Sequence, residues 1–228
     1  WPKFHIRFTP GSPSSLPGGS YLVGMGQTYS TIGLAVADIN HRGITGPINF
    51  ILTDTLITCD SVGGENMFPV FIGPVIGSSS INTISIGPDT GMIHLHYNGN
   101  AAGAIAIQSG YINFSYTEEP IFGLVGAQYV TLHGFNMTST DSVLDAGIGV
   151  INSSATLGSQ HNEVRDIYIQ LNRTNIYSIG IKQQLLVTPT SATGVNSYNK
   201  YLNLKVRNAY SGIQLLGNAT YPDINCEV

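Results

Sequence analysis

The stretches Asn162–Gln170 (NEVRDIYIQ) and Asn199–Arg207 (NKYLNLKVR) share one pattern, and this pattern decides the predicted fold. Each begins with Asn and ends with apolar and polar residues in alternation, as a β-strand with one buried face does. The residues expected to face the core are Ile167, Ile169, Leu204 and Val206, and those expected to face solvent are Tyr168, Gln170, Lys205 and Arg207. The second stretch begins 37 residues after the first, so we expect two neighbouring parallel strands with Ile167 beside Leu204.

A shorter strand recurs alongside the long one. Its copies are Gly147–Val150, Ser178–Ile181 and Gly212–Leu215, at offsets of 31 and 34 residues, and an earlier long strand begins at Tyr129, 35 residues before Val164. One such unit cannot close a core, whereas stacked units bury a continuous apolar column. The sequence therefore predicts an all-β fold, a right-handed parallel β-helix (a solenoid). A two-sheet sandwich is the alternative.

The N-terminal part of the chain has a different pattern. Residues 1–27 are rich in Pro, Gly and Ser and are expected to be an extended lead-in, while residues 28–228 form a single domain. Ile32, Ala35, Val36 and Ile39 have the spacing of an amphipathic helix, so we expect a helix near residues 30–42 that caps the N-terminal end of the column. Residues 221–226 resemble the start of another repeat, and we expect the chain to continue beyond Val228.

Composition excludes several classes of function. Charged residues make up 10% of the chain and the net charge is -4, which argues against a nucleic-acid partner bound through a dense basic face. No apolar run approaches the roughly 18 residues of a membrane-spanning helix. The two cysteines, Cys59 and Cys226, lack the spacing of a zinc site, so no metal or other cofactor is expected.

The order of short motifs in the N-terminal half resembles that of Bacteroidetes-type secreted surface proteins, which are exported by the type IX route. The motifs begin with Tyr29–Ile32, Ala35–Asn40 and Gly43–Phe50 and continue through Leu52–Asp54, Glu65–Val70, Ser80–Pro88 and Tyr129–Phe135. The resemblance covers roughly residues 20–215. It implies a β-helical, adhesin-like module of a larger protein at the cell surface, and it implies no catalytic residues.

An enzymatic alternative is a glycosidase or a polysaccharide lyase, whose catalytic residues would be carboxylates. Hydrolysis of a glycosidic bond needs two carboxyl groups roughly 5–10 Å apart, and the best candidates are Asp145 and Asp166, with Asp141 nearby in sequence. However, Asn203 replaces Asp166 one repeat later, as expected of a stacked surface position. His94 and His96 share one face of a strand but lack an identifiable third metal ligand.

Several residues are candidates for glycosylation. Sequons are present at Asn136, Asn152, Asn172 and Asn218, and another at Asn113 lies within a predicted strand. The resemblance adds Thr55, Ser61 and Ser142, which follow Asp in short motifs similar to that group's O-glycosylation sites.

The leading interpretation is a non-catalytic, extracellular structural or adhesive module at the cell surface. Its exposed Tyr and Asn side chains would contact glycans, neighbouring surface proteins or further copies of the chain. The first alternative is a carbohydrate-active enzyme that uses Asp145 and Asp166. The second is a component of a phage or viral fibre.

Overall fold

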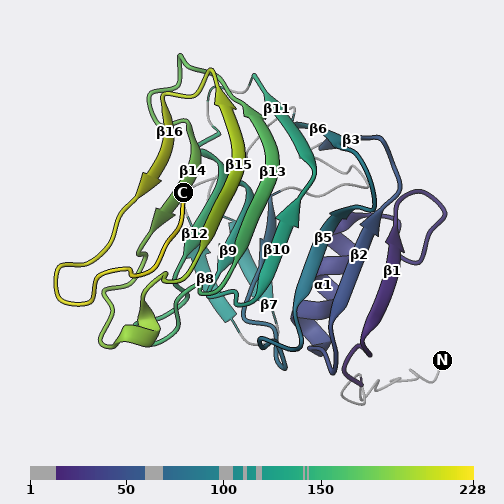
Figure 1. Ribbon diagram of the computed structural model, residues 1–228, viewed down its shortest axis with the longest axis horizontal. Coiled ribbons are helices and arrows are strands. Elements are labelled where there is room, and N and C mark those ends of the chain that lie inside the picture. The colour runs from purple at the N-terminus through teal and green to yellow at the C-terminus, as the bar shows by residue number, and fades with distance from the viewer. Residues whose placement is uncertain are drawn as a thin grey trace, which may run out of the picture.

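The computed structural model describes residues 14–59, 69–97, 105–109, 112–116, 120–140, 142 and 144–228. Within these residues the chain forms a nine-stranded parallel sheet, a five-stranded parallel sheet, a two-stranded antiparallel sheet and one α-helix (Figure 1). The antiparallel pair is β7 (Ile105–Ser109) with β8 (Ile112–Tyr116). A short 3-10 helix spans Ala192–Gly194.

The nine-stranded sheet has two arms that meet at one strand. Its members are β1 (Gly19–Val23), β2 (Ile48–Leu52), β3 (Leu56–Cys59), β5 (Ile84–Pro88), β6 (Ile93–Tyr97), β10 (Val130–His133), β11 (Phe135–Ser139), β13 (Glu163–Gln170) and β15 (Lys200–Arg207). The first half of β13 pairs with β10 and its second half with β11, while β15 pairs along the other edge of β13. From β10 one arm continues through β5 and β2 to β1, and from β11 the other continues through β6 to β3.

The five-stranded sheet faces the larger one across a shared apolar core. Its order is β16 (Ser211–Leu215), β14 (Ile179–Gln184), β12 (Ala146–Ile151), β9 (Pro120–Val125) and β4 (Val70–Ile72). The rings of Phe122 in β9 and Phe135 in β11 lie 5.2 Å apart between their centroids, and both side chains are completely buried. Alternating inward residues of both sheets therefore fill one core, as the strand pattern predicts.

The predicted pairing of the long strands is confirmed, and the short strands also pair in parallel in the predicted order, but in a register that differs by two residues from the alignment of their motifs. Ile167 of β13 lies in register with Leu204 of β15 in a parallel pair. Among the short strands, Ile148 pairs with Ile181, and Ile181 pairs with Ile213. The glycines of β12, β14 and β16 are thus aligned with one another. The offsets of 31 and 34 residues predicted from the sequence do not produce this alignment.

A helix covers the exposed edge of the smaller sheet. Helix α1 (Ile32–Arg42) begins after Thr31, whose side chain accepts a hydrogen bond from the Leu34 backbone N–H at 3.2 Å. The Asn40 side chain donates to the Phe71 carbonyl at 2.9 Å and accepts from the Gly73 N–H at 3.0 Å. The helix therefore lies beside β4, where a further strand of the five-stranded sheet would lie, and protects that edge from pairing with another chain.

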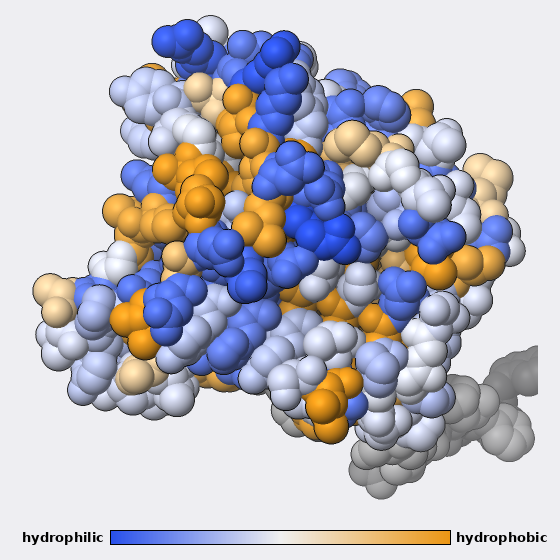
Figure 2. Space-filling model, viewed as in Figure 1, coloured by the Kyte–Doolittle hydropathy of each residue, from blue (hydrophilic) through white to orange (hydrophobic). Residues whose placement is uncertain are grey.

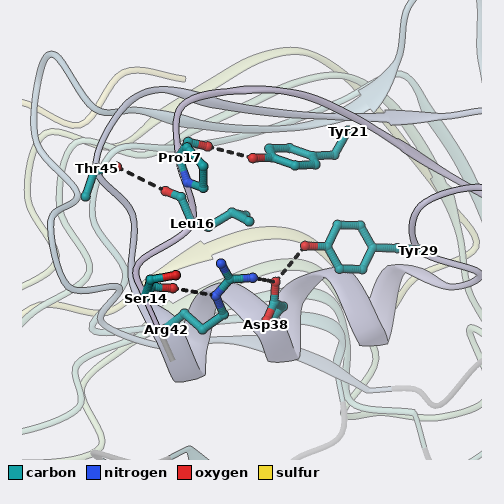
Figure 3. A network of polar contacts seen from close by, with 8 residues as sticks. All are labelled: Ser14, Leu16, Pro17, Tyr21, Tyr29, Asp38, Arg42 and Thr45. Carbon is teal, nitrogen blue, oxygen red and sulfur yellow. Dashed lines mark hydrogen bonds and ion pairs between the residues drawn. The ribbon is translucent and has the colours of Figure 1, made fainter. Parts of the chain in front are cut away.

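Polar contacts anchor the other side of the helix (Figure 3). Tyr29 donates to Asp38 at 2.6 Å, and Arg42 forms an ion pair with Asp38 at 2.9 Å and donates to the Ser14 carbonyl at 2.7 Å. Burial and the neighbouring Asp38 carboxylate raise the pKa of Tyr29, so the phenol keeps the proton that it donates. Part of the segment expected as a lead-in thus belongs to the fold, because β1 also lies within residues 1–27.

The prediction of an all-β, right-handed parallel β-helix with a capping helix is wrong. The described residues form two separate parallel sheets, one two-stranded antiparallel sheet and one α-helix, a mixed arrangement similar to that of α/β proteins. The helix forms where it was expected, but it covers the side of the core beside β4 and behind β2 and β5 (Figure 1) instead of its end. Helical periodicity shows which face of a helix is buried, but not which part of the core that face covers.

Buried amides connect successive layers where the strands begin. Asn162 accepts a hydrogen bond from the Val130 N–H at 3.0 Å and donates to the Ala127 carbonyl at 2.9 Å. Its own backbone and side-chain nitrogens donate to the Asn199 side chain at 3.0 and 3.1 Å. Both residues are at most 2% exposed. The amides therefore satisfy backbone groups that the sheets leave unpaired, whose burial without a partner would cost about 1–3 kcal/mol each.

We expect Ile39→Asp to destabilise the protein by several kcal/mol or to prevent folding, because the side chain is completely buried and the new carboxylate would have no partner there. Leu34→Asp is the matched control, since Leu34 lies on the same helix and is 55% exposed. Thermal unfolding followed by circular dichroism measures both variants. Equal melting temperatures for wild type and Ile39→Asp would contradict the docking of this helix.

A pair of aligned glycines offers a second test of the fold. A Cβ at Gly180 would lie 2.5 Å from the Gly212 carbonyl oxygen and 2.6 Å from Val206, whereas a Cβ at Gly212 would meet nothing within 4 Å. We therefore expect Gly180→Ala to cost about 1–3 kcal/mol of unfolding free energy and Gly212→Ala to change it by about 0.5 kcal/mol or less. Urea unfolding of both variants measures this, and similar values for the two would contradict the alignment of β14 with β16.

Candidate functional site

A groove with a volume of about 580 Å³ crosses the outer face of the nine-stranded sheet. It is lined by Met92, Asn136, Asp166, Ile167, Tyr168, Asn203, Lys205 and Arg207. Figure 2 shows that hydrophilic side chains gather over β13 and β15 on this face. The groove therefore lies on the part of the sheet where the polar positions of the long strands point outward.

Strand register arranges these polar residues in two rows across four strands. The first row consists of His94, Asn136, Tyr168 and Lys205, from β6, β11, β13 and β15 in that order. The second consists of His96, Thr138, Gln170 and Arg207 from the same strands. Neighbouring parallel strands lie about 4.8 Å apart, so each row presents polar side chains at this regular spacing.

Hydrogen bonds within the rows hold most of these side chains in place. Asn136 contacts the His94 ring at 3.0 Å, and the His96 ring contacts the Thr138 hydroxyl at 2.9 Å. The Tyr168 hydroxyl donates to Gln170 at 2.9 Å and so connects the two rows. The rows are thus preorganised without a ligand, which lowers the entropic cost of binding one.

The ammonium of Lys205 lies over the Tyr168 ring, 5.7 Å from its centroid. This cation–π contact holds the Lys205 side chain across the groove instead of leaving it to move freely in solvent. Lys205 and Arg207 are both exposed and are separated by Val206 on one strand. Their side chains therefore project from the same face of β15.

Asp166 and Asn203 occupy equivalent positions of the two long strands, between paired residues on either side. Their φ angles are 55° and 50°, in the left-handed region that Asp and Asn tolerate better than most residues. Asp166 accepts a hydrogen bond from the Asn203 side chain at 2.7 Å and forms an ion pair with Arg165 at 2.6 Å. Arg165 also pairs with Glu163 at 2.9 Å. The left-handed backbone at Asp166 interrupts strict alternation, so that Arg165 and Asp166 both reach the surface.

The Asp166 carboxylate is held in its charged form. The hydrogen bond from Asn203, followed in importance by the one from Arg165, lowers the pKa of Asp166 below its ordinary value of 3.8. Nearby, the His133 ring contacts the Ser85 hydroxyl at 3.2 Å. Burial, and to a smaller extent the charge of Arg165, lower the pKa of His133 below 6.5, which keeps this imidazole neutral at pH 7.

The structure does not bring Asp145 and Asp166 together. Asp145 directly precedes β12 in the five-stranded sheet, where its carbonyl accepts a hydrogen bond from the Ile179 N–H at 2.9 Å. Asp166 lies on the outer face of the opposite sheet, and Asp145 is not among the residues that line the groove. Asp141, the third candidate carboxylate, lies outside the described residues.

The residues considered as metal ligands have other partners. His94 and His96 do share the outer face of β6, as predicted, but their Nδ1 atoms contact Asn136 and Thr138. Within the described ranges, no group of three His, Cys, Asp or Glu side chains could hold a metal ion.

Candidate glycosylation sites differ in accessibility. Asn152 is completely buried, and its amide donates hydrogen bonds to the carbonyls of Ser154, Val187 and Gly194. The folded chain therefore leaves no room for a glycan on Asn152. Asn136 lies in the groove, and Asn172 and Asn218 accept hydrogen bonds from Thr174 and Thr220 in local turns. Thr55 and Ser142 are exposed, whereas Ser61 and the side chain of Asn113 lie outside the description.

The sequence predicted the outward direction of Tyr168, Lys205 and Arg207, and it assigned contacts with glycans to exposed Tyr and Asn side chains in general, but no function to Lys205 or Arg207. It also treated Asn203 only as the counterpart of Asp166 and did not single out His133. The signal that could have revealed the site is the alternation in the two long strands, since it repeats on neighbouring strands and must produce rows of side chains. Which shorter strands continue these rows could not be deduced, because β6 and β11 follow bends in the chain.

Comparison of the chain with protein-family models, with curated proteins and with solved structures finds no match. Among the described residues, no helix has both the length and the apolar character needed to cross a membrane. The candidate site is therefore interpreted from its own geometry and chemistry.

The pKa of Asp166 provides a test of the site. We expect the carboxyl carbon of Asp166 to titrate by NMR below 3.8 in the wild type, and Asn203→Ala to raise this pKa because the largest stabilising contact is lost. Since the folded-state pKa is lowered, the pairing stabilises the fold above the unfolded-state pKa, and this contribution is lost as the pH falls through the folded-state value. A wild-type pKa at or above 3.8 would contradict the described contacts.

Proposed function

We propose that this chain is a non-catalytic, extracellular binding module and that the groove over β6, β11, β13 and β15 receives a glycan. The observation that carries the proposal is the lining of the groove, where amide, phenol and basic side chains from the polar rows of β11, β13 and β15 lie at the regular spacing of neighbouring strands. A polymer of similar units can contact equivalent side chains on successive strands. The resemblance to secreted surface proteins supports a position outside the cell.

The chemistry of the groove favours a sugar over an apolar ligand. Tyr168 offers an aromatic face with a hydroxyl group, while Asn136 and Asn203 offer amides that both donate and accept hydrogen bonds. Sugars combine apolar C–H faces with many hydroxyl groups and match such a surface.

The state of the carboxylates favours binding over catalysis. A glycosidase needs an acid with a raised pKa next to a second carboxylate on the same surface. Here the pKa of Asp166 is lowered, and the neighbouring Glu163 is paired with Arg165. Asp145, the partner that the enzymatic alternative requires, lies on the other sheet.

A glycan-binding screen tests the proposal. We expect the purified chain to bind at least one polysaccharide in a panel of acidic and neutral glycans, and Tyr168→Ala to weaken this binding about 3- to 10-fold through loss of the aromatic contact. Tyr177→Ala is the control, because Tyr177 is 66% exposed and does not line the groove. Absence of binding across the panel, or equal effects of the two substitutions, would contradict the proposal.

The same panel separates binding from catalysis. We expect no release of reducing ends or unsaturated sugars during long incubation with any glycan that binds. Turnover that is lost in Asp166→Asn or in Asp145→Asn would instead support the carbohydrate-active enzyme.

A further inference from the structure

We infer that the glycan is acidic and that Lys205 and Arg207 bind its carboxylate groups. This inference rests on the proposed function, since it names the class of ligand for the same groove. It arises from a separate observation, the distribution of paired and unpaired charges over the molecule.

Several cations of the described chain already have carboxylate partners. Arg42 pairs with Asp38, Arg165 with Glu163 and Asp166, and Lys200 with Glu227. Lys205 contacts the Tyr168 ring, and neither it nor Arg207 has an ion pair within the described residues. In a chain with a net charge of -4, these two cations form a local concentration of positive charge on one groove.

The two cations are positioned to act together on one ligand. They alternate on β15 with Val206 between them, so their Cα atoms lie about 7 Å apart and their side chains point to the same side. Lys205 ends the first polar row and Arg207 ends the second, so a ligand that lies along either row meets a cation at the β15 edge of the groove. The guanidinium can bind a carboxylate with two parallel hydrogen bonds, while the ammonium acts as a compact point charge.

The carboxylate of Asp166 does not prevent this mode of binding. Asp166 also lines the groove, but its carboxylate forms an ion pair with Arg165, which also pairs with Glu163, and its oxygens already accept hydrogen bonds from Arg165 and Asn203. A polyanion would therefore be attracted to the side of Lys205 and Arg207. Two unpaired cations are too few for the strong, salt-dependent binding of nucleic acid, which relies on many phosphate contacts.

Calorimetric titration tests this inference with four probes: alginate oligosaccharides, neutral malto-oligosaccharides of equal length, dextran sulfate and polyuridylate. We expect alginate to bind more tightly than the other three. The double variant Lys205→Ala/Arg207→Ala should weaken alginate binding about tenfold or more, because charge-assisted hydrogen bonds are lost. Lys200→Ala, which removes one charge from the same strand away from the groove, should leave the affinity unchanged.

The outcomes distinguish the inference from the proposed function. Tighter or equal binding of malto-oligosaccharide, with continued sensitivity to Tyr168→Ala, would overturn the acidic ligand and leave the glycan groove standing. Tighter binding of dextran sulfate or polyuridylate would show recognition of charge alone and would overturn the carboxylate. Alginate binding that is unaffected by the double variant would also overturn the inference, and a failure of all four probes and of the wider panel would overturn both proposals.

Discussion

Parallel, in-register pairing of the long strands β13 and β15 is the constraint on which the rest of the structure depends. Side chains of a strand alternate between two faces, so a shift of one residue would move the apolar set out of the core and the polar set into it. The observed register keeps Ile167 beside Leu204 and Tyr168 beside Lys205. One choice of pairing thus determines both the core on one face and the polar rows on the other.

The other features of the fold protect this arrangement at its weak points. Buried Asn162 and Asn199 satisfy backbone groups where strands begin, because those groups have no partner in a sheet. Helix α1 covers the outer edge of β4, where open backbone groups would otherwise invite another strand. Polar residues therefore stabilise the ends and edges, while apolar residues fill the space between the sheets.

The candidate site combines order inherited from the sheet with a local departure from it. Regular pairing aligns His94, Asn136, Tyr168 and Lys205 in a row without any special loop. The left-handed backbone at Asp166 breaks the alternation and brings a carboxylate to the surface beside Arg165, with which it forms an ion pair. The groove consequently holds one carboxylate that already has an ion-pair and a hydrogen-bond partner and two cations that have no ion pair among the described residues, and this difference underlies the proposal of an acidic glycan.

The amino-acid sequence by itself determined the local properties of this protein. Alternation predicted the long strands and their outward side chains, apolar spacing predicted the helix near residues 30–42, and the repeated Asn predicted that Asn162 and Asn199 lie at equivalent places. These properties depend on neighbours a few residues apart, which a sequence displays directly. The sequence predicted the wrong register for the short strands, because their similar Gly-Ile motifs permit more than one alignment of the glycines.

Only the tertiary structure decided how these elements are combined. The structure has two parallel sheets with a helix along one side where the sequence predicted a β-helix. Asp145 directly precedes a strand of one sheet, whereas Asp166 lies on a strand of the other. Asn152, a predicted glycosylation site, is buried. The rows on β6, β11, β13 and β15 likewise depend on pairing between residues more than 30 positions apart. Such contacts are selected by the packing of the whole core, because many pairings satisfy the local pattern equally well and only the complete fold discriminates between them.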